Sequence, residues 1–177
     1  MLAAQIRSAG GLPVYLGIAK DTEKDLMEKF ESALKADIVV SSGGVSVGDY
    51  DLVKASLQKM GQEMLFWKVA MKPGKPLAFG RIGETPIFGL PGNPVSAYVG
   101  YQVFVRPAIR KMINLPSEPR ATRTVRVMER VNSDGRESYL RIFAAHENGE
   151  WVARLTGHQG SGNLRSLVNA NALLIVP

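Results

Sequence analysis

Apolar residues spaced three or four positions apart predict one helix over residues 1–9 and a second over 21–34. Gly10 suits the end of the first helix, and Asp21 can accept hydrogen bonds from the opening N–H groups of the second. Between them, Pro13-Val-Tyr-Leu-Gly-Ile18 has the pattern of a strand. Because an α/β domain usually starts with a strand, we expect that Met1 is not the natural start and that preceding sequence is missing.

A second apolar, β-branched run, residues 37–40, predicts a buried parallel strand. A glycine-containing loop follows it, and Val53, Leu57 and Met60 then recur at helical spacing. The predicted order of elements is therefore strand, glycine loop and helix.

Three further apolar runs, residues 63–69, 77–80 and 85–90, predict strands, with a turn at Gly83-Glu84 between the last two. Asn93 followed by Pro94 is a strong helix start, with the asparagine as N-cap. The apolar stripe of this helix reaches Met112. Pro107 lies inside the stripe, which predicts a kink or break between 103 and 107.

The pattern changes near residues 115–119, which are rich in proline. Beyond them, short alternating runs at 121–127, 138–142 and 150–154 replace the helical spacing, and Asp134-Gly135 and Asn148-Gly149 are turn signals. The sequence therefore predicts an α/β domain joined by a linker to a small all-β domain.

Charge and composition exclude several classes of protein. The 177 residues are 45% hydrophobic and carry a net charge of +6, but the basic residues are scattered, which does not favour a nucleic-acid surface. Small anionic substrates explain the positive balance equally well. No stretch is long and apolar enough to cross a bilayer, and the absence of cysteine is consistent with a cytoplasmic protein.

The glycine loop, residues 41–51, is the first candidate for chemistry. Gly43 and Gly44 let an anionic ligand approach the backbone amides, and Asp49 and Asp51 follow closely. Two carboxylates would repel a phosphate unless a divalent cation or a proton intervenes. The alternative is an ordinary turn between strand and helix, with an aspartate as the helix cap.

The second candidate is Lys72-Pro-Gly-Lys-Pro76, whose residues suit a type II turn with a lysine at each end. Two ammonium groups held this close repel each other, so a bound anion would relieve the strain; the alternative is a solvated surface turn. The cap at Asn93 also follows a strand, and ligands of open parallel sheets bind at the carboxyl ends of strands. The glycine loop after residues 37–40 and the loop at Asn93 could therefore face one site.

In the predicted β domain, Arg141 lies among apolar residues, and residues 158–163 form a polar loop rich in glycine. The plain alternatives are a solvated arginine on a strand and a hairpin loop. His146 and His158 are too isolated to form a metal cluster, and their spacing supports no catalytic triad.

Three motifs in this order, Ser42-Gly-Gly-Val-Ser-Val-Gly-Asp-Tyr-Asp51, Lys72-Pro-Gly-Lys-Pro76 and Gly89-Leu-Pro-Gly-Asn-Pro-Val-Ser-Ala97, resemble the C-terminal half of molybdopterin molybdenumtransferase. This molybdenum insertase family is related to the catalytic domain of gephyrin. The resemblance implies a three-layer, open parallel-sheet molybdopterin-binding domain over residues 1–117. It also implies a small, β-barrel-like C-terminal domain over residues 118–177.

The reaction implied by the resemblance inserts molybdate into adenylated molybdopterin and releases AMP and molybdenum cofactor, with Mg²⁺ as the usual divalent metal. Matched motif by motif, the nucleotide–phosphate loop and the pterin side would comprise Gly43, Gly44, Ser46, Pro91, Asn93, Pro94 and Ser96. Asp49 and Asp51 would engage the metal or the nucleotide. Molybdate would bind Lys72, Lys75, Arg141 and Ser161, and the catalytic set would be Asp49, Asp51, Lys72 and Lys75.

The chain departs from the family pattern at its start, where two earlier domains and a first strand with an acidic Thr-Gly-Asp/Asn-Glu motif are not present. We therefore expect the chain alone to turn over poorly. The resemblance also implies a homodimer for the full-length protein, with the molybdopterin adenylyltransferase as a partner. Two alternatives stay open: the chain is itself such an adenylyltransferase, or it is a non-catalytic binding or scaffold module.

Overall fold

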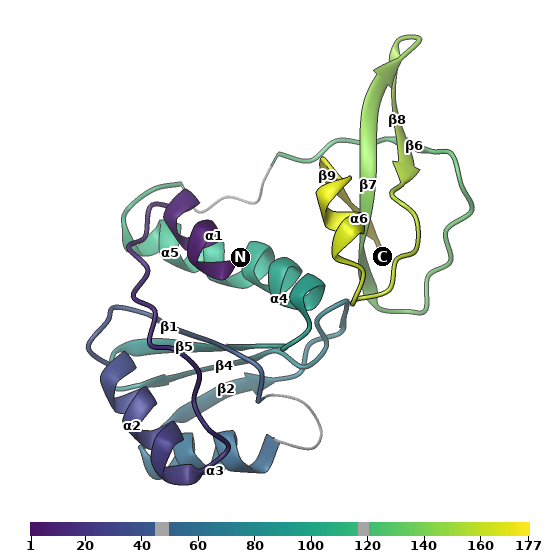
Figure 1. The fold of residues 1–177 in the computed structure, drawn as a ribbon. Coiled ribbons are helices and arrows are strands. Elements are labelled where there is room, and N and C mark those ends of the chain that lie inside the picture. The colour runs from purple at the N-terminus through teal and green to yellow at the C-terminus, as the bar shows by residue number, and fades with distance from the viewer. Residues whose placement is uncertain (45–49, 117–120) are drawn as a thin grey trace.

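The computed structural model describes residues 1–44, 50–116 and 121–177, and it contains two sheets (Figure 1). The first has the strand order β1 (Val39–Ser42), β5 (Thr85–Leu90), β4 (Ala78–Ile82) and β2 (Glu63–Trp67). Strands β1 and β5 are parallel, whereas β4 is antiparallel to both β5 and β2. The sheet is therefore mixed rather than parallel throughout, because the tight turn at Gly83-Glu84 joins β4 to β5 as a hairpin.

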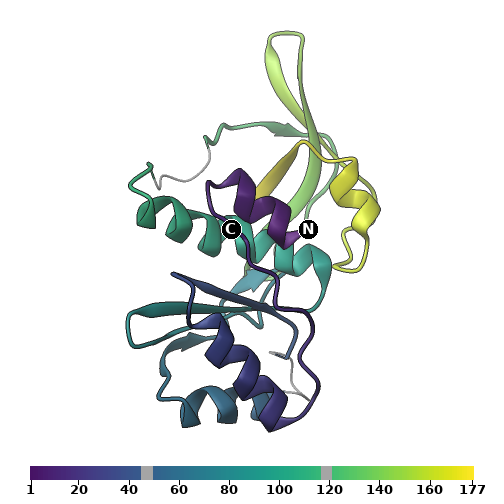
Figure 2. The same cartoon turned by 60° about the vertical axis from the view of Figure 1, so that its left-hand side comes forward.

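Helices cover both faces of this sheet and make three layers (Figures 1 and 2). On one face lie α2 (Glu23–Ala33) and α3 (Tyr50–Lys59). On the other lie α1 (Leu2–Ser8), α4 (Pro94–Gly100), the π-helical segment η1 (Tyr101–Val105) and α5 (Arg106–Met112). The predicted three-layer α/β domain is confirmed.

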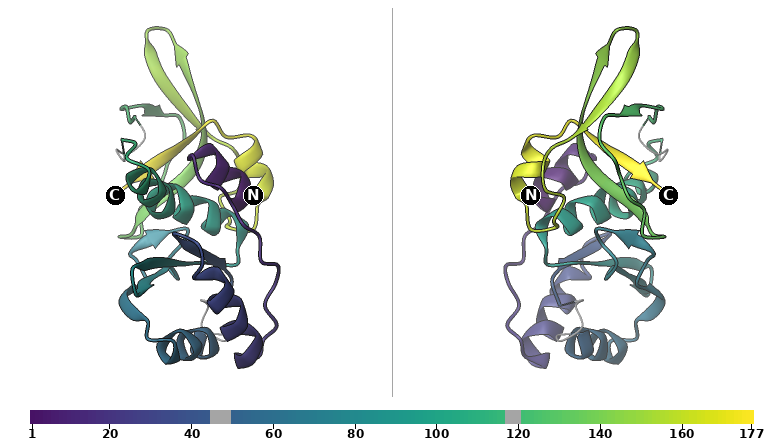
Figure 3. Two further views of the ribbon diagram at one scale, coloured as in Figure 1. Left: turned by 90° about the vertical axis from the view of Figure 1, so that its left-hand side faces the viewer. Right: turned by 90° about the vertical axis from the view of Figure 1, so that its right-hand side faces the viewer.

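The second sheet has the order β3 (Met71–Lys72), β7 (Glu137–Glu147), β8 (Glu150–Leu155) and β6 (Arg126–Val127), and β9 (Ala172–Val176) also pairs with β7. A short helix, α6 (Leu164–Val168), precedes β9. The hairpin of β7 and β8 projects at the end of the molecule opposite α2 and α3 (Figure 3). The all-β prediction is confirmed for the sheet but omitted α6 and β9, and only two residues of the run at 121–127 pair as a strand.

A strand exchange links the two sheets. Strand β3 follows β2 in the chain but pairs in parallel with β7, with Met71 opposite Glu137 and Lys72 opposite Ser138. The amide of Glu137 also donates to the carbonyl oxygen of Ala70 at 3.2 Å. These backbone hydrogen bonds fix the turn after β3 against the second sheet.

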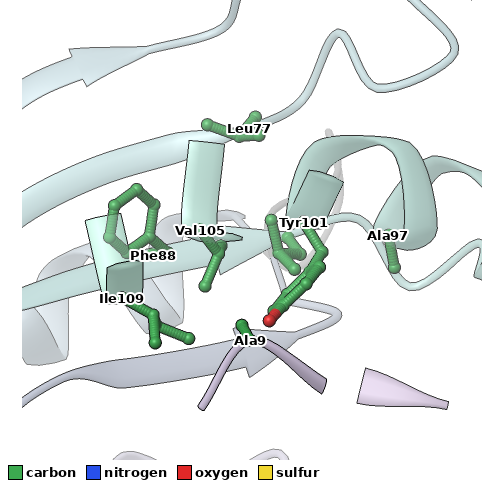
Figure 4. Packing of buried hydrophobic residues seen from close by; sticks show 8 residues of the cluster. Ala9, Leu77, Phe88, Ala97, Tyr101, Val105 and Ile109 are labelled. Carbon is green, nitrogen blue, oxygen red and sulfur yellow. The ribbon is translucent and has the colours of Figure 1, made fainter. Parts of the chain in front are cut away.

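The larger core lies between the first sheet and the helices α1, α4 and α5. Figure 4 shows Tyr101, Val105 and Ile109 gathered with Ala9 and Phe88. Tyr101 is fully buried, and its hydroxyl donates to the main-chain oxygen of Gln5 at 2.7 Å. The tyrosine thus ties the helix after β5 to α1.

The predicted break in the long helix is confirmed as the π-helical segment Tyr101–Val105. Pro107, within the first two positions of α5, has no N–H to donate to the carbonyl of Val103. A π-helical turn widens the helix locally and accommodates such a lost bond.

The predicted strand over 13–18 is wrong. Residues 11–20 run along the outside of the domain from α1 to α2 without pairing to any described strand (Figure 2). Leu12, Tyr15 and Ile18 are 90%, 80% and 86% exposed. An apolar run forms a strand only where a neighbouring strand accepts its hydrogen bonds, which the pattern alone does not reveal.

The start of α2 also differs from the prediction. The N-cap is Thr22, whose hydroxyl accepts from the amide of Asp25 at 3.3 Å, and not Asp21. Both residue types cap helices well, so composition does not distinguish adjacent candidates.

In the described part of the chain, no helix has the length and apolar character needed to span a bilayer.

Leu77→Ala should lower the free energy of unfolding by about 2–5 kcal/mol, because this side chain is fully buried between the turn after β3 and the helical layer. Leu12→Ala, the same change at a 90% exposed position, should alter it by less than about 0.5 kcal/mol. Urea unfolding of both variants measures the difference, and equal losses would contradict the described core.

Candidate functional site

A cavity of about 680 Å³ lies where the two sheets meet. Its lining comes from the loops after β1 and β5, the turn after β3, strand β7 and the loop before α6. The described lining residues are Gly43, Gly44, Met71, Lys72, Pro73, Gly74, Lys75, Pro76, Pro91, Gly92, Asn93, Ser96, Arg136, Leu140, Arg141, Gln159, Gly160 and Ser161.

The loops after β1 and β5 lie side by side at the carboxyl ends of two parallel strands. The amide of Gly43 donates to the carbonyl of Leu90 at 3.0 Å, and the hydroxyl of Ser42 donates to the carbonyl of Pro91 at 3.2 Å. A Cβ on Gly92 would lie 3.4 Å from the Cα of Gly43, which is van der Waals contact, so the two loops pack closely together. The two loops predicted to face one site do line the same cavity.

Asn93 begins the helix after β5 as predicted. Its side-chain oxygen accepts from the amide of Val95 at 3.2 Å, and Pro94 occupies the first helical turn. Asn93 and the buried Ser96 line the cavity, while Pro94 is exposed and is not among the described lining residues.

The turn after β3 carries two exposed lysines into the cavity lining. The Lys72–Pro73 peptide bond is cis, and Gly74 has a φ of 117°, a positive value of the kind that the predicted type II turn requires at this position. The carbonyl of Lys75 accepts from the amides of Val69 and Leu77, both at 3.0 Å. These bonds hold the base of the turn.

Arg141 is fully buried, so it is not the solvated strand arginine considered as an alternative. Its Nε donates to the hydroxyl of Ser166 at 3.0 Å and its Nη2 donates to the carbonyl of Gly160 at 3.0 Å. Its Nη1 has no hydrogen-bond partner, and no carboxylate of the described chain pairs with it. Burial lowers the pKa of the guanidinium, yet arginine remains charged in proteins.

Gln159 holds the loop before α6 against β7. Its Oε1 accepts from the amide of Arg141 at 2.8 Å, and its Nε2 donates to the carbonyl of the same residue at 3.1 Å. The side-chain amide thus completes a pair of bonds that a neighbouring strand would otherwise make. Gly160 and Ser161 are brought to the cavity beside Arg141 as a result.

Arg136 and Asp134 are the charged residues that the sequence reasoning missed. Arg136 lines the cavity. Asp134 accepts from Nη2 of Arg136 at 2.6 Å and from Nζ of Lys72 at 2.9 Å. These two cations hold the pKa of the Asp134 carboxyl well below its usual range. No sequence pattern links positions 134 and 72, which come together because β3 pairs with β7.

The predicted positions Ser46 and Asp49 lie outside the described residues, as does the side chain of Asp51. In the residues that are described, no group of three or more His, Cys, Asp or Glu side chains could hold a metal ion.

The charges of the cavity favour an anionic ligand. Lys72, Lys75, Arg136 and Arg141 line it, and no carboxylate belongs to its described lining. A buried cation without a counter-charge carries an electrostatic cost that a bound anion would relieve. Ser161, also in the lining, adds a hydroxyl donor suited to the oxygens of a phosphate or another oxyanion.

The family model described as a probable molybdopterin binding domain matches residues 1–111. That of the MoeA C-terminal region, domain IV, matches residues 124–177. The molybdopterin molybdenumtransferase of Bacillus subtilis is 34% identical over 179 residues, covering all of this chain and 42% of the relative. Molybdopterin molybdenumtransferase 2 of Mycobacterium tuberculosis is 37% identical over 186 residues, covering all of this chain and 45% of the relative.

Among solved structures, the molybdopterin biosynthesis MoeA protein of Pyrococcus horikoshii superimposes with a TM-score of 0.80 at 27% identity, over 99% of this chain and 42% of that one. The chain therefore consists of an α/β domain of the probable molybdopterin binding family followed by a MoeA C-terminal β domain. The chain belongs to the molybdopterin molybdenumtransferase (MoeA) family of molybdenum cofactor biosynthesis. It spans less than half the length of the curated relatives named above.

The boundary predicted between residues 117 and 118 falls in 117–120, outside the described residues, and stays a prediction.

Ser166→Ala should lower the free energy of unfolding by about 1–3 kcal/mol, because it leaves Nε of the buried Arg141 without its acceptor. Ser32→Ala, at an exposed serine of α2, is the matched control and should stay within about 0.5 kcal/mol of the wild type. Chemical unfolding measures both. A loss no larger than that of the control would mean that the hydroxyl does not support the guanidinium.

Asn93→Ala should cost about 1 kcal/mol of stability through the lost helix cap, and Asn93→Asp should retain most of it because a carboxylate caps equally well. Thr22→Ala, at the N-cap of α2, provides a comparison at a cap outside the cavity. Thermal melting of the three variants checks this, and an unaffected Asn93→Ala would contradict the capping role.

Proposed function

We propose that this chain forms the substrate-binding half of a molybdenum insertase, which transfers molybdate to adenylated molybdopterin and releases AMP and molybdenum cofactor. One observation carries the proposal. A buried arginine with an unpartnered Nη1, Arg141, lines a cavity together with Lys72, Lys75 and Ser161, the positions that the family resemblance assigns to molybdate. The reaction itself is proposed from that resemblance.

Molybdate is a dianion, and the proposed subsite offers it three cations and one hydroxyl. Hydrogen bonds to charged groups are each worth about 1.5–3 kcal/mol, more than bonds between neutral groups. The contribution of Arg141 should be the largest, because its charge is already desolvated and fixed by Ser166 and Gly160. Lys72 and Lys75 are exposed, so water screens their contribution.

The adenylated molybdopterin would lie along the other wall of the cavity. Gly43 and Gly44, with Ser46 beyond the described residues, would receive the phosphates, and Pro91, Asn93, Pro94 and Ser96 would shape the pterin side. The cavity volume of about 680 Å³ is in the range of small-molecule sites. Holding both substrates in one cavity would supply most of the catalysis through positioning and charge.

Asp49 and Asp51 stay proposed ligands of Mg²⁺ or of the nucleotide. When bound, a divalent cation would neutralise the phosphates beside these carboxylates. A homodimer, an interaction with the molybdopterin adenylyltransferase and a cytoplasmic location also stay proposals. They are properties of the full-length family members, and this chain covers less than half of such a protein.

The test of the anion site is a calorimetric titration of the chain with molybdate and with tungstate. Arg141→Met should weaken both affinities by about tenfold or more, since one charged hydrogen bond accounts for at least one decade. Arg123→Met is the control, because it also removes one positive charge. Arg123 lies against Trp151 and outside the described cavity lining, so the affinity of this variant for molybdate should stay within about twofold of the wild type. Equal effects of the two variants would reduce the site to a general attraction by net charge.

The test of the reaction is AMP release. Molybdate-dependent release from adenylated molybdopterin supports the insertase, ATP-dependent adenylation of molybdopterin supports the adenylyltransferase, and binding without turnover supports a scaffold. A chimera in which this chain replaces the matching segment of the Bacillus subtilis relative should release AMP faster than the chain alone. Turnover by the chain alone at the rate of the chimera would contradict the expectation that it needs further domains.

A further inference from the structure

A carboxylate that no motif identifies contacts two cations of the proposed oxyanion site. Asp134 is not among the described cavity residues, but it accepts hydrogen bonds from two that are, Arg136 at 2.6 Å and Lys72 at 2.9 Å. It therefore neutralises part of the charge that an anionic ligand would meet.

The fold holds Asp134 in this place. It belongs to the turn before β7, in which the amide of Gly135 donates to the hydroxyl of Ser133 at 3.2 Å, and that hydroxyl donates to the main-chain oxygen of Pro177 at 2.6 Å. The pairing of β3 with β7 brings Lys72 to the same turn. The contact thus joins the two sheets at the cavity.

The other two cations differ in their surroundings. No described carboxylate pairs with Lys75 or Arg141. A ligand could thus be anchored by Arg141 and Lys75 directly, whereas it would have to share Lys72 and Arg136 with Asp134. The side chains of Lys72 and Asp134 are 53% and 37% exposed, so water can replace their contact and the exchange is reversible.

We propose that Asp134 is an internal counter-anion that competes with a bound oxyanion for Lys72 and Arg136, and so limits how tightly the site holds it. This inference rests on the proposed oxyanion site. A dianion that is transferred to a second substrate has to break its hydrogen bonds with the cations that bound it. A neighbouring carboxylate can then pair with the released cations.

The test is calorimetric titration of the complete 177-residue chain with molybdate and with tungstate. Asp134→Asn should bind both oxyanions about three- to tenfold more tightly than the wild type. Each exposed ion pair that no longer competes for a cation should raise the affinity by up to about fivefold. Asp134→Glu keeps the charge and should stay closer to the wild type. Asp134→Ser, which removes the charge with a different side chain, should change the affinity in the same direction as Asp134→Asn.

Glu147→Gln is the matched control. Glu147 binds Arg154 through both carboxylate oxygens, at 2.6 and 2.9 Å, at the other end of β7. The change also removes one negative charge and releases an arginine, so an increase in affinity that came only from net charge would appear here too. We expect less than about a twofold change, and melting curves confirm that each variant is folded.

Two results would overturn the inference. If Asp134→Asn binds molybdate more weakly than the wild type, the carboxylate chiefly positions the cations. If Asp134→Asn binds with the same affinity as Glu147→Gln, its effect comes only from net charge. Arg141→Met in the Asp134→Asn background separates this inference from the proposed site. If Arg141→Met weakens binding in both backgrounds while Asp134→Asn changes nothing, only the role of Asp134 is wrong. If neither the wild type nor Asp134→Asn binds molybdate or tungstate, the oxyanion site and the counter-anion are both wrong.

Discussion

A buried positive charge without a counter-charge dominates this structure. Arg141 is fully enclosed, and its hydrogen bonds go to neutral oxygens of Ser166 and Gly160. Such a charge is costly to bury, because neutral acceptors replace only part of its hydration. These oxygens use only part of the hydrogen-bonding capacity of the guanidinium, because Nη1 has no acceptor. A bound anion, as proposed above, would supply both the acceptor and the counter-charge.

The pairing of β3 with β7 brings further cations near Arg141. Two residues of the first domain pair with the second sheet, and the turn with Lys72 and Lys75 therefore lines the same cavity as Arg141. The glycine loops after β1 and β5 meet at the remaining wall. The cavity thus depends on both domains, because neither sheet alone brings the cations to the glycine loops.

Local chemistry made much of this predictable. Asn93-Pro94 predicts a helix start, Pro107 a break and Asn148-Gly149 a hairpin, and each follows from one or two residues. The N-cap of α2, Thr22 rather than Asp21, is a local failure, but the failures that affect the sheets and the cavity are long-range. The run at 13–18 is apolar but has no paired strand, and the sheet is mixed because a hairpin joins β4 to β5. Asp134 could not be linked to Lys72, since only strand pairing between domains brings them together. The motifs identified most of the cavity wall, but its internal counter-charge needed the structure.

The most direct test of the central claim is the position of a bound oxyanion. Tungstate has the shape and charge of molybdate, and tungsten scatters X-rays anomalously, so a crystal of the chain soaked with tungstate would locate the ion. We expect an anomalous peak from a tungstate ion in this cavity. An oxygen of the ion should lie within about 3 Å of Nη1 of Arg141, and the ion should lie within reach of Ser161 and of the turn with Lys72 and Lys75. A peak elsewhere on the protein, with none in this cavity, would contradict it.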